Sequence, residues 1–500
     1  MSMPPPDCEE STRAFVADFE CLMEGIEEML ALQQRITTDG DLTAIQDHYA
    51  KHPEDALCHI YRPLDHSIVP CRREGIYAIG RMAQRLVEEA PNGPDLSSDA
   101  IAKTISNRIV QVMIDRITDD NEFVGILKSY ARSSETEHVE ICHHLPCVLT
   151  HELPKNPIAG EPGPDQFDLG PVKFRRLEIF LADLNQSVEQ KQKEVGGSLE
   201  HFVEAAKKHG WVASVSIPRC APDVSRARAE TIVGAAIDFL KLVIGLRHAK
   251  SMRLPHTSAA RNRETCVLSE TNGKVEWTWY GRELEGALVG GNWFDSIPQN
   301  FRCFAGHLLS RCLNGRQSEA SNRLVDALKW FGDASFEESS GVQIAKWVTA
   351  LERLTTTGGF STNVFSERVA ILTGEREPEP LERAYRDAQK AYDLRCDVMH
   401  GTRSQDDRHF AINAGLVHDL TRMAILGGFG LHTFLEGVKK DARVESIADS
   451  YDNEVRPFRG IFDRLGKEFS AKRTAIRKAR RPCASTPCKM VLNLKRDESS

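Results

Sequence analysis

The stretch LERAYRDAQKAYDLRCDVMHG, residues 381–401, is the strongest helical pattern in the chain and decides how its C-terminal part is interpreted. At helical spacing it presents one broad apolar face, made of Leu381, Ala384, Ala388, Ala391, Tyr392, Val398 and Met399. Arg395 falls in the middle of this face, where a guanidinium is costly unless it is paired. His400 follows near the expected helix end, and Gly401 is the residue type that ends helices in a left-handed conformation. An Arg and a His held together at a helix end suit the chemistry of a phosphodiester.

Length and composition predict a folded, soluble protein. A chain of 500 residues is too long for one ordinary core, so we expect roughly two to four domains. The net charge of −8 argues against wholesale coating of nucleic acid, although a local basic patch is compatible with it. The 13 Cys are an odd number without framework spacing and fit reduced thiols. The acidic, proline-rich start is unlike a secretory signal, and the apolar runs are too short to cross a bilayer. We therefore predict a cytoplasmic protein with no membrane partner.

The fold class that the patterns predict is mainly α and multidomain, with a mixed α/β (α+β) middle domain. Apolar residues recur at helical spacing through most of residues 13–150. Residues 211–217, WVASVSI, alternate as a strand does, and Asn272–Gly273 predicts a hairpin near 265–280. The predicted segments are a disordered lead-in over 1–12, a helical domain over 13–152, a Pro/Gly-rich linker or loop over 153–171, an α+β domain over 172–300, a helical bundle over 301–445 and a basic, disordered tail over 446–500.

A family resemblance gives the Arg395 and His400 pair its context. The spacing Arg-x4-His is weak by itself, and it occurs a second time at Arg302 and His307. Three stretches stand in order around the first pair: WVTALERL (347–354), FSERVAIL (365–372) and AYDLRCDVMHG (391–401). Together they make residues 318–435 resemble a HEPN domain of the Apea-like branch.

The resemblance implies a helical bundle that forms a homodimer and brings two Arg-x4-His elements to one cleft. Active members are endoribonucleases that need no metal or other cofactor. By this resemblance His400 would act as general base or acid on the RNA 2′-hydroxyl, and Arg395 would hold the scissile phosphate. The supporting residues would be Glu352, Tyr392, Cys396 and Asp397. Cys396 departs from the polar Asn, Asp or His that nuclease members usually carry, and a thiol is a weak donor and acceptor.

Two functions of different classes remain open from the sequence. The first is an RNA-cleaving effector of the kind used in antiphage defence or toxin systems, with the N-terminal region sensing an unidentified ligand or regulator. The second is a non-catalytic module for dimerisation, RNA binding or partner binding. In the second, Arg395 pairs with Glu352 of the WVTALERL stretch, and His400 merely caps its own helix. The two functions differ in the direction that they predict for the Arg395 side chain, which faces an open cleft in the first and Glu352 in the second.

Two further segments carry candidate ligands. Residues 138–151 hold six potential zinc ligands: His138, Cys142, His143, His144, Cys147 and His151. Zinc sites usually show tighter Cys pairs, and Pro146 interrupts the segment, so we assign no metal site and expect a buried packing segment. Residues 472–496 carry nine Lys or Arg and no acid. They could contact nucleic-acid phosphates, but they include no aromatic residue for base stacking.

Overall fold

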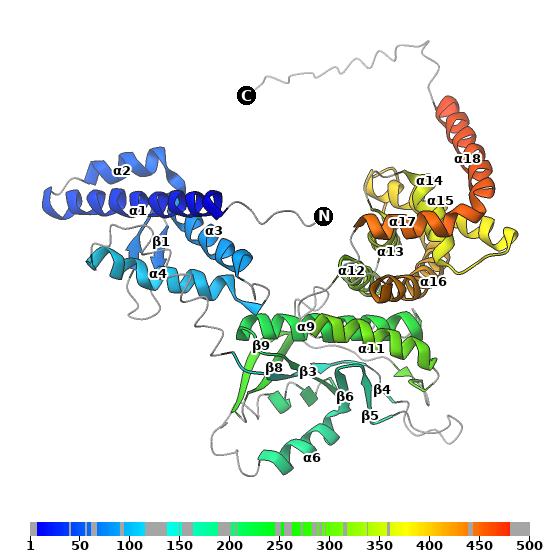
Figure 1. Ribbon diagram of the computed structural model, residues 1–500, viewed down its shortest axis with the longest axis horizontal. Helices are drawn as coiled ribbons and strands as arrows, with labels where there is room; N and C mark the ends of the chain where they lie inside the picture. Colours follow the sequence, from blue (N-terminus) through cyan, green and yellow to red (C-terminus); the bar gives the residue numbers. More distant parts are fainter. Residues whose placement is uncertain are drawn as a thin grey trace, which may run out of the picture. The chain divides into compact units, whose positions relative to one another are not determined.

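The computed structural model divides the chain into two compact units, residues 1–317 and residues 318–500 (Figure 1). Most of the described chain is helical, with a small antiparallel sheet in the first unit. No helix within the described ranges is both long and apolar enough to cross a membrane. The structure describes residues 8–39, 42–55, 58–61, 68–90, 95–115, 138–149, 151–152, 164–188, 202–204, 206–207, 209–245, 252–254, 263–271, 274–282, 288–289, 293–295, 297–313, 318–337, 339–357, 361–438 and 444–480.

The first unit begins with a group of helices around an apolar core. Its elements are α1 (Cys8–Asp39), α2 (Leu42–Lys51), η1 (Pro53–Asp55), β1 (His59–Tyr61), β2 (Ile68–Pro70), α3 (Arg73–Glu89) and α4 (Ser98–Asp115). Helical spacing of apolar residues predicted this core, and its members are buried: Phe15, Phe19, Leu22, Ile26, Ile79, Met82, Leu86 and Ile105. The predicted lead-in over 1–12 is too long, because α1 already begins at Cys8.

A six-stranded antiparallel sheet forms the second part of this unit, with strand order β5-β6-β7-β3-β8-β9. The strands are β3 (Ile141–Cys147), β5 (Gln166–Leu169), β6 (Val172–Arg176), β7 (Trp211–Ile217), β8 (Arg263–Thr271) and β9 (Lys274–Arg282), and β4 (His151–Glu152) pairs separately with β10 (Leu288–Val289). Helices α9 (Pro222–Ile244) and α11 (Gln299–Leu313) lie side by side along one face, and α6 (Leu177–Val188) lies at the other (Figure 1).

The sheet confirms two sequence predictions. Strand β7 has the predicted limits 211–217. Strands β8 and β9 pair antiparallel with Thr271 opposite Lys274, so two residues connect them, as the Asn-Gly pair predicted. The two turn residues themselves lie outside the described residues.

The sheet also corrects the predicted domain limits. Strand β3 lies inside the segment predicted as helical over 13–152, and β5 lies inside the predicted linker 153–171. The α+β domain therefore begins before residue 172, and its first helix begins at Leu177, after β6. Strand β3 is central and buried on both faces, so its sequence lacks the alternation that marks a half-exposed strand.

The second unit is a helical bundle that starts later than predicted. Its elements are α12 (Glu319–Ala334), α13 (Ser340–Thr355), α14 (Thr362–Leu372), α15 (Pro378–Met399), α16 (Arg408–Val438), α17 (Val444–Val455), η4 (Arg456–Phe458) and α18 (Arg459–Arg480). Helix α11, predicted to open a bundle over 301–445, belongs to the first unit, where it packs against α9. Helix α13 packs against α12, α14, α15 and α16, and buries Trp347, Val348, Leu351 and Leu354 completely.

The predicted disordered tail over 446–500 is wrong for its first part. Helices α17 and α18 continue to Arg480, and five of their apolar side chains are buried in the bundle. These side chains repeat at helical spacing and form one stripe: Ile447, Tyr451, Val455, Phe462 and Leu465. The run of basic residues from Lys472 obscured the stripe in the sequence. Residues 481–500 lie outside the described residues.

The buried carboxylate of Asp55 makes the stability of the first unit depend on pH. Its side chain accepts hydrogen bonds from the Arg73 backbone N–H at 2.9 Å and from His48 Nε2 at 3.1 Å, and Arg72 lies 3.4 Å away. Burial by itself raises the pKa of Asp55, but these hydrogen bonds and the Arg72 charge outweigh it and hold the pKa below its ordinary value.

We expect Asp55→Asn to destabilise the first unit by about 1–3 kcal/mol near neutral pH, because it removes hydrogen bonds to a buried charge. The folded pKa is lowered, so this contribution is complete above the unfolded pKa and is lost as the pH falls through the folded pKa. The unfolding free energies of wild type and variant, from exchange of α3 amides corrected for intrinsic rates, should therefore converge only as the pH falls below the ordinary Asp pKa of 3.8. A difference that grows on acidification would contradict this assignment.

Candidate functional site

Helix α15 confirms most of the apolar face predicted for residues 381–401. Leu381, Ala384, Ala388, Ala391 and Val398 are buried. Met399, the last helical residue, is 59% exposed instead, and Tyr392 is half-buried. The sequence pattern also missed three buried residues of this helix, which are Tyr385, Gln389 and Leu394.

The end of α15 is built as the sequence predicted. Gly401 has φ +64°, the left-handed conformation that ends helices. Its N–H donates to the carbonyl of Val398 at 3.2 Å, and the Thr402 N–H donates to the carbonyl of Asp397 at 3.0 Å, which together make a Schellman motif. The Thr402 hydroxyl also donates to the Asp397 carboxylate at 2.7 Å. Asp397 thus fixes the turn after the helix, and His400 is the capping residue.

Arg395 is directed into the bundle. Its guanidinium lies 3.6 Å from the carboxylate of Glu352 on α13, with 26% of the Arg395 side chain and 21% of the Glu352 side chain exposed. The same guanidinium lies over the Tyr392 ring, 5.9 Å from its centroid. Arg395 Nε is buried and has no hydrogen-bond partner within the described residues. Burial raises the pKa of Glu352, and the Arg395 charge offsets part of that effect.

The candidate site is therefore divided. Arg395, Glu352 and Tyr392 come together between α13 and α15. His400 is exposed at the end of α15, and Cys396 is half-buried one turn before it. An exposed imidazole can exchange protons with a ligand. The guanidinium, in contrast, is already used by Glu352, so this conformation does not offer it to a phosphate beside His400.

The His/Cys segment of residues 138–151 forms the central strand β3 and its flanks. Its buried His143 contacts Ser269 Oγ through Nδ1 and Ser225 Oγ through Nε2, both at 2.8 Å. Burial lowers the pKa of His143 to about 4, so the ring is neutral at physiological pH. His144 Nδ1 contacts Ser214 Oγ at 2.9 Å. The described part of the chain holds no group of three or more residues arranged to bind a metal ion. The prediction of a buried packing segment is confirmed for strand β3.

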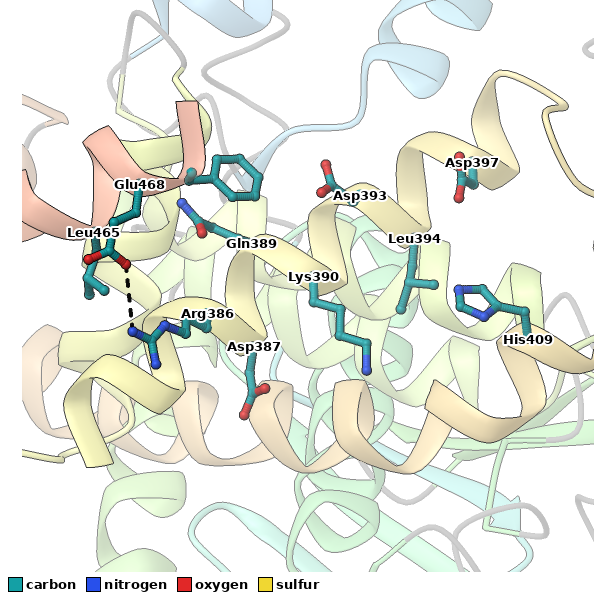
Figure 2. A pocket seen from close by; sticks show the side chains of 11 residues that line it. Arg386, Asp387, Gln389, Lys390, Asp393, Leu394, Asp397, His409, Leu465 and Glu468 are labelled. Carbon is teal, nitrogen blue, oxygen red and sulfur yellow. Dashed lines mark ion pairs between the residues drawn. The ribbon is translucent and has the colours of Figure 1, made fainter. Parts of the chain in front are cut away.

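A second feature of α15 was not predicted from the sequence. A groove of about 820 Å³ runs along the polar face of the helix, on the side away from Arg395 (Figure 2). We call it the α15 groove. It is lined by Arg386, Asp387, Gln389, Lys390, Asp393, Leu394, Asp397, His409, Leu465, Glu468 and Phe469. Charged residues recur along this face of residues 381–401, but the part of the groove formed by α18 could not be foreseen from a segment interpreted as a disordered tail.

No protein-family model, no curated protein and no solved structure matches this chain.

Proposed function

We propose that the second unit is a HEPN-type helical bundle that serves as a non-catalytic binding module. The resemblance to the Apea-like branch supports this proposal, because its three stretches fall on three consecutive helices of one unit. Residues 347–354 lie in α13, residues 365–372 form the last part of α14, and residues 391–399 end α15.

The observation that carries the non-catalytic proposal is the ion pair between Arg395 and Glu352. A catalytic Arg must present its fork to the phosphate, where it stabilises the developing charge. Here the guanidinium links α15 to α13 and is mostly buried, which is the arrangement of a structural tie. Cys396 adds to this, since the polar residue usual at that position of the nucleases is replaced by a thiol.

A double-mutant cycle tests the tie. Arg395→Met and Glu352→Gln, singly and together, should reveal a coupling free energy of about 0.5–1.5 kcal/mol in the exchange of α13 and α15 amides. The matched control is the Arg383 and Glu379 pair of the same helix, whose side chains are 71% and 89% exposed at 3.5 Å. The equivalent cycle there should give a coupling within about 0.3 kcal/mol of zero. Equal couplings for the two pairs would remove the support for a tie.

The second candidate function is a metal-independent endoribonuclease, and the exposure of His400 favours it. In this alternative Glu352 restrains Arg395 in a resting state, and RNA draws the guanidinium away. The raised pKa of Glu352 makes its carboxylate easier to neutralise than an ordinary one. The two candidates differ in the RNA cleavage that they predict for Glu352→Gln. In a binding module this change lowers the stability of the bundle and no RNA is cut. In a restrained nuclease the same change activates RNA cleavage.

A further inference from the structure

Two cysteines of the first unit stand opposite each other at the end of a short antiparallel ladder. Strands β1 and β2 pair with His59 opposite Pro70. The same register continued by one residue places Cys58 opposite Cys71, and the Cys71 N–H donates to the Cys58 carbonyl at 3.4 Å. Side chains of directly opposed residues lie on the same face of a ladder. The two thiols therefore face the same side of β1 and β2.

This arrangement is within reach of a disulfide bond. Opposed residues of a hydrogen-bonded antiparallel pair have Cα atoms about 5.5 Å apart, inside the range of about 4.4–6.8 Å that disulfides span. Their Cβ atoms lie about 4.5–5.5 Å apart, whereas a disulfide brings them to about 3.8 Å. The bond therefore requires the two chain segments to approach by about 1 Å. Strain of this kind makes a disulfide easier to reduce, which suits a bond that forms and breaks.

The surroundings of the two thiols determine how they react. Cys71 is fully buried, and its sulfur lies against Gly75 of α3, where a Cβ would come within 2.6 Å of it. Burial raises the pKa of the Cys71 thiol to about 12. Cys58 is half-buried and donates to the Glu54 carbonyl at 3.1 Å, and burial together with the Asp55 charge raises its pKa. Both sulfurs are therefore thiols at neutral pH, and Cys58 is the more accessible of the two.

We propose that Cys58 and Cys71 are a reversible redox pair, which a small-molecule disulfide oxidises to a cross-strand disulfide bond. Cys58 loses its proton and its sulfur attacks the small disulfide, which releases one small thiol and leaves a mixed disulfide on Cys58. Cys71 loses its proton in turn and attacks the Cys58 sulfur, which releases the second small thiol. Two protein S–H bonds and one small-molecule S–S bond are thus exchanged for one protein S–S bond and two small thiols. The pair lies in the first unit and is independent of the role proposed for Arg395.

A third cysteine is the competing partner of Cys71. The charge of an ionised Cys21 on α1 raises the pKa of Cys71 more than the Cys58 charge does, so both thiols are neighbours of Cys71. Cys21, however, forms a side-chain hydrogen bond with Arg81 of α3. The ladder fixes the backbone separation of Cys58 and Cys71 through their backbone hydrogen bond. The geometry therefore favours Cys58 as the partner.

The test maps disulfides by mass spectrometry in the full-length protein after titration with oxidised and reduced glutathione. Remaining thiols are blocked by alkylation before digestion with trypsin. Trypsin does not cut between Arg62 and Pro63, so one peptide, residues 52–72, carries both cysteines. In oxidised wild type this peptide should escape alkylation and be lighter by two hydrogens than its dithiol form. Cys21→Ser should give the same result, and Cys58→Ser should abolish it.

A synthetic peptide of residues 52–72 separates the effect of the fold from nearness in the sequence. Because the ladder already closes the loop, the equilibrium constant for oxidation should be at least about tenfold larger in the folded protein than in the peptide. Oxidation should also accelerate as the pH rises, since both thiol pKa values are raised. The proposal is overturned if the protein keeps both thiols in excess oxidised glutathione at about pH 9, if Cys71 is linked to Cys21 instead, or if the peptide oxidises as readily as the protein.

Discussion

Gly427→Ala should destabilise the second unit by about 3 kcal/mol or more, among the largest effects of any single-methyl change in the bundle. A Cβ built at Gly427 would lie 1.8 Å from the carbonyl oxygen of Leu372, which is the last residue of α14. The obstacle is backbone rather than a flexible side chain, so α14 and α16 would have to move apart.

Gly430→Ala is the matched control for this prediction. It lies on the same helix, three residues later, and a Cβ there meets nothing within 4 Å. Because alanine forms helix better than glycine, Gly430→Ala should stabilise by about 0.5–1 kcal/mol. Hydrogen exchange of peptides from α14 and α16 measures both changes. A loss of similar size in the two variants would mean that helix propensity or local flexibility, rather than the contact with Leu372, decides the result.

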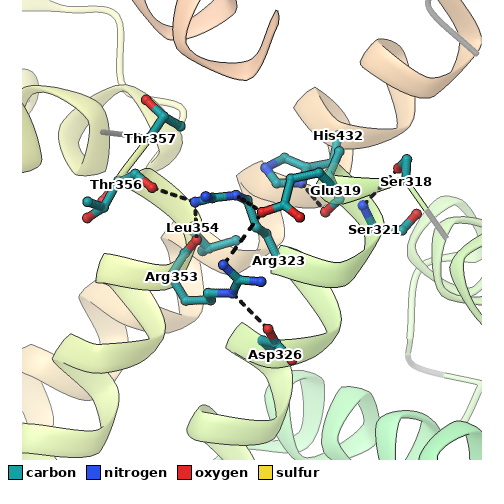
Figure 3. Close-up of polar contacts among 12 residues, drawn as sticks. Ser318, Glu319, Ser321, Arg323, Asp326, Arg353, Leu354, Thr356, Thr357 and His432 are labelled. Carbon is teal, nitrogen blue, oxygen red and sulfur yellow. Dashed lines mark hydrogen bonds and ion pairs between the residues drawn. The ribbon is translucent and has the colours of Figure 1, made fainter. Parts of the chain in front are cut away.

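Arg323→Met is expected to cost about 3 kcal/mol, because Arg323 closes the end of α13 from inside the bundle. Its guanidinium donates to the carbonyls of Arg353 and Thr356, at 3.1 and 2.5 Å, and its Nε donates to Glu319 at 2.8 Å (Figure 3). The two carbonyls belong to the helix terminus, where no backbone N–H of the helix can reach them. Only 8% of the Arg323 side chain is exposed, so water replaces these bonds poorly.

Arg383→Met provides the comparison, since its ion pair with Glu379 is exposed and should contribute less than about 0.5 kcal/mol. Exchange of the last amides of α13 should rise in Arg323→Met and stay unchanged in Arg383→Met. If Arg323→Met were no more destabilised than Arg383→Met, the hydrogen bonds to Arg353 and Thr356 would have no role in stability.

The sequence predicted local structure well where one periodicity dominates. Helix α15 has a wide apolar face and a glycine at its end, and strand β7 and the β8–β9 hairpin carry alternation and a specific turn. Strand β3 was not predicted, because burial on both faces removes the alternation of apolar and polar residues. Helix α18 was not predicted, because its short apolar stripe runs directly into a segment of basic residues that is typical of a disordered tail.

The pairing of Arg395 with Glu352 was predictable from the sequence, but its role was not. The sequence identified Arg395 on an apolar face and named Glu352 as its partner, which the 3.6 Å ion pair confirms. It could not decide between a catalytic and a structural guanidinium, because that depends on how α13 and α15 pack. The α15 groove shows the same limit, since Leu465 and Glu468 reach it from a helix more than sixty residues away in the sequence.

We propose that Arg395 ties α15 to α13 and that the bundle is a binding module that does not cleave RNA. The most direct test incubates the purified protein with total and transfer RNA in EDTA, beside Glu352→Gln, His400→Ala and Glu352→Gln/His400→Ala. We predict intact RNA in all four samples, because the guanidinium serves the fold and Cys396 replaces a polar residue of the nucleases. RNA cut by wild type or by Glu352→Gln, and left intact when His400→Ala is present, would contradict this proposal and establish a metal-independent nuclease. Cleavage by Glu352→Gln but not by wild type would show in addition that Glu352 restrains it.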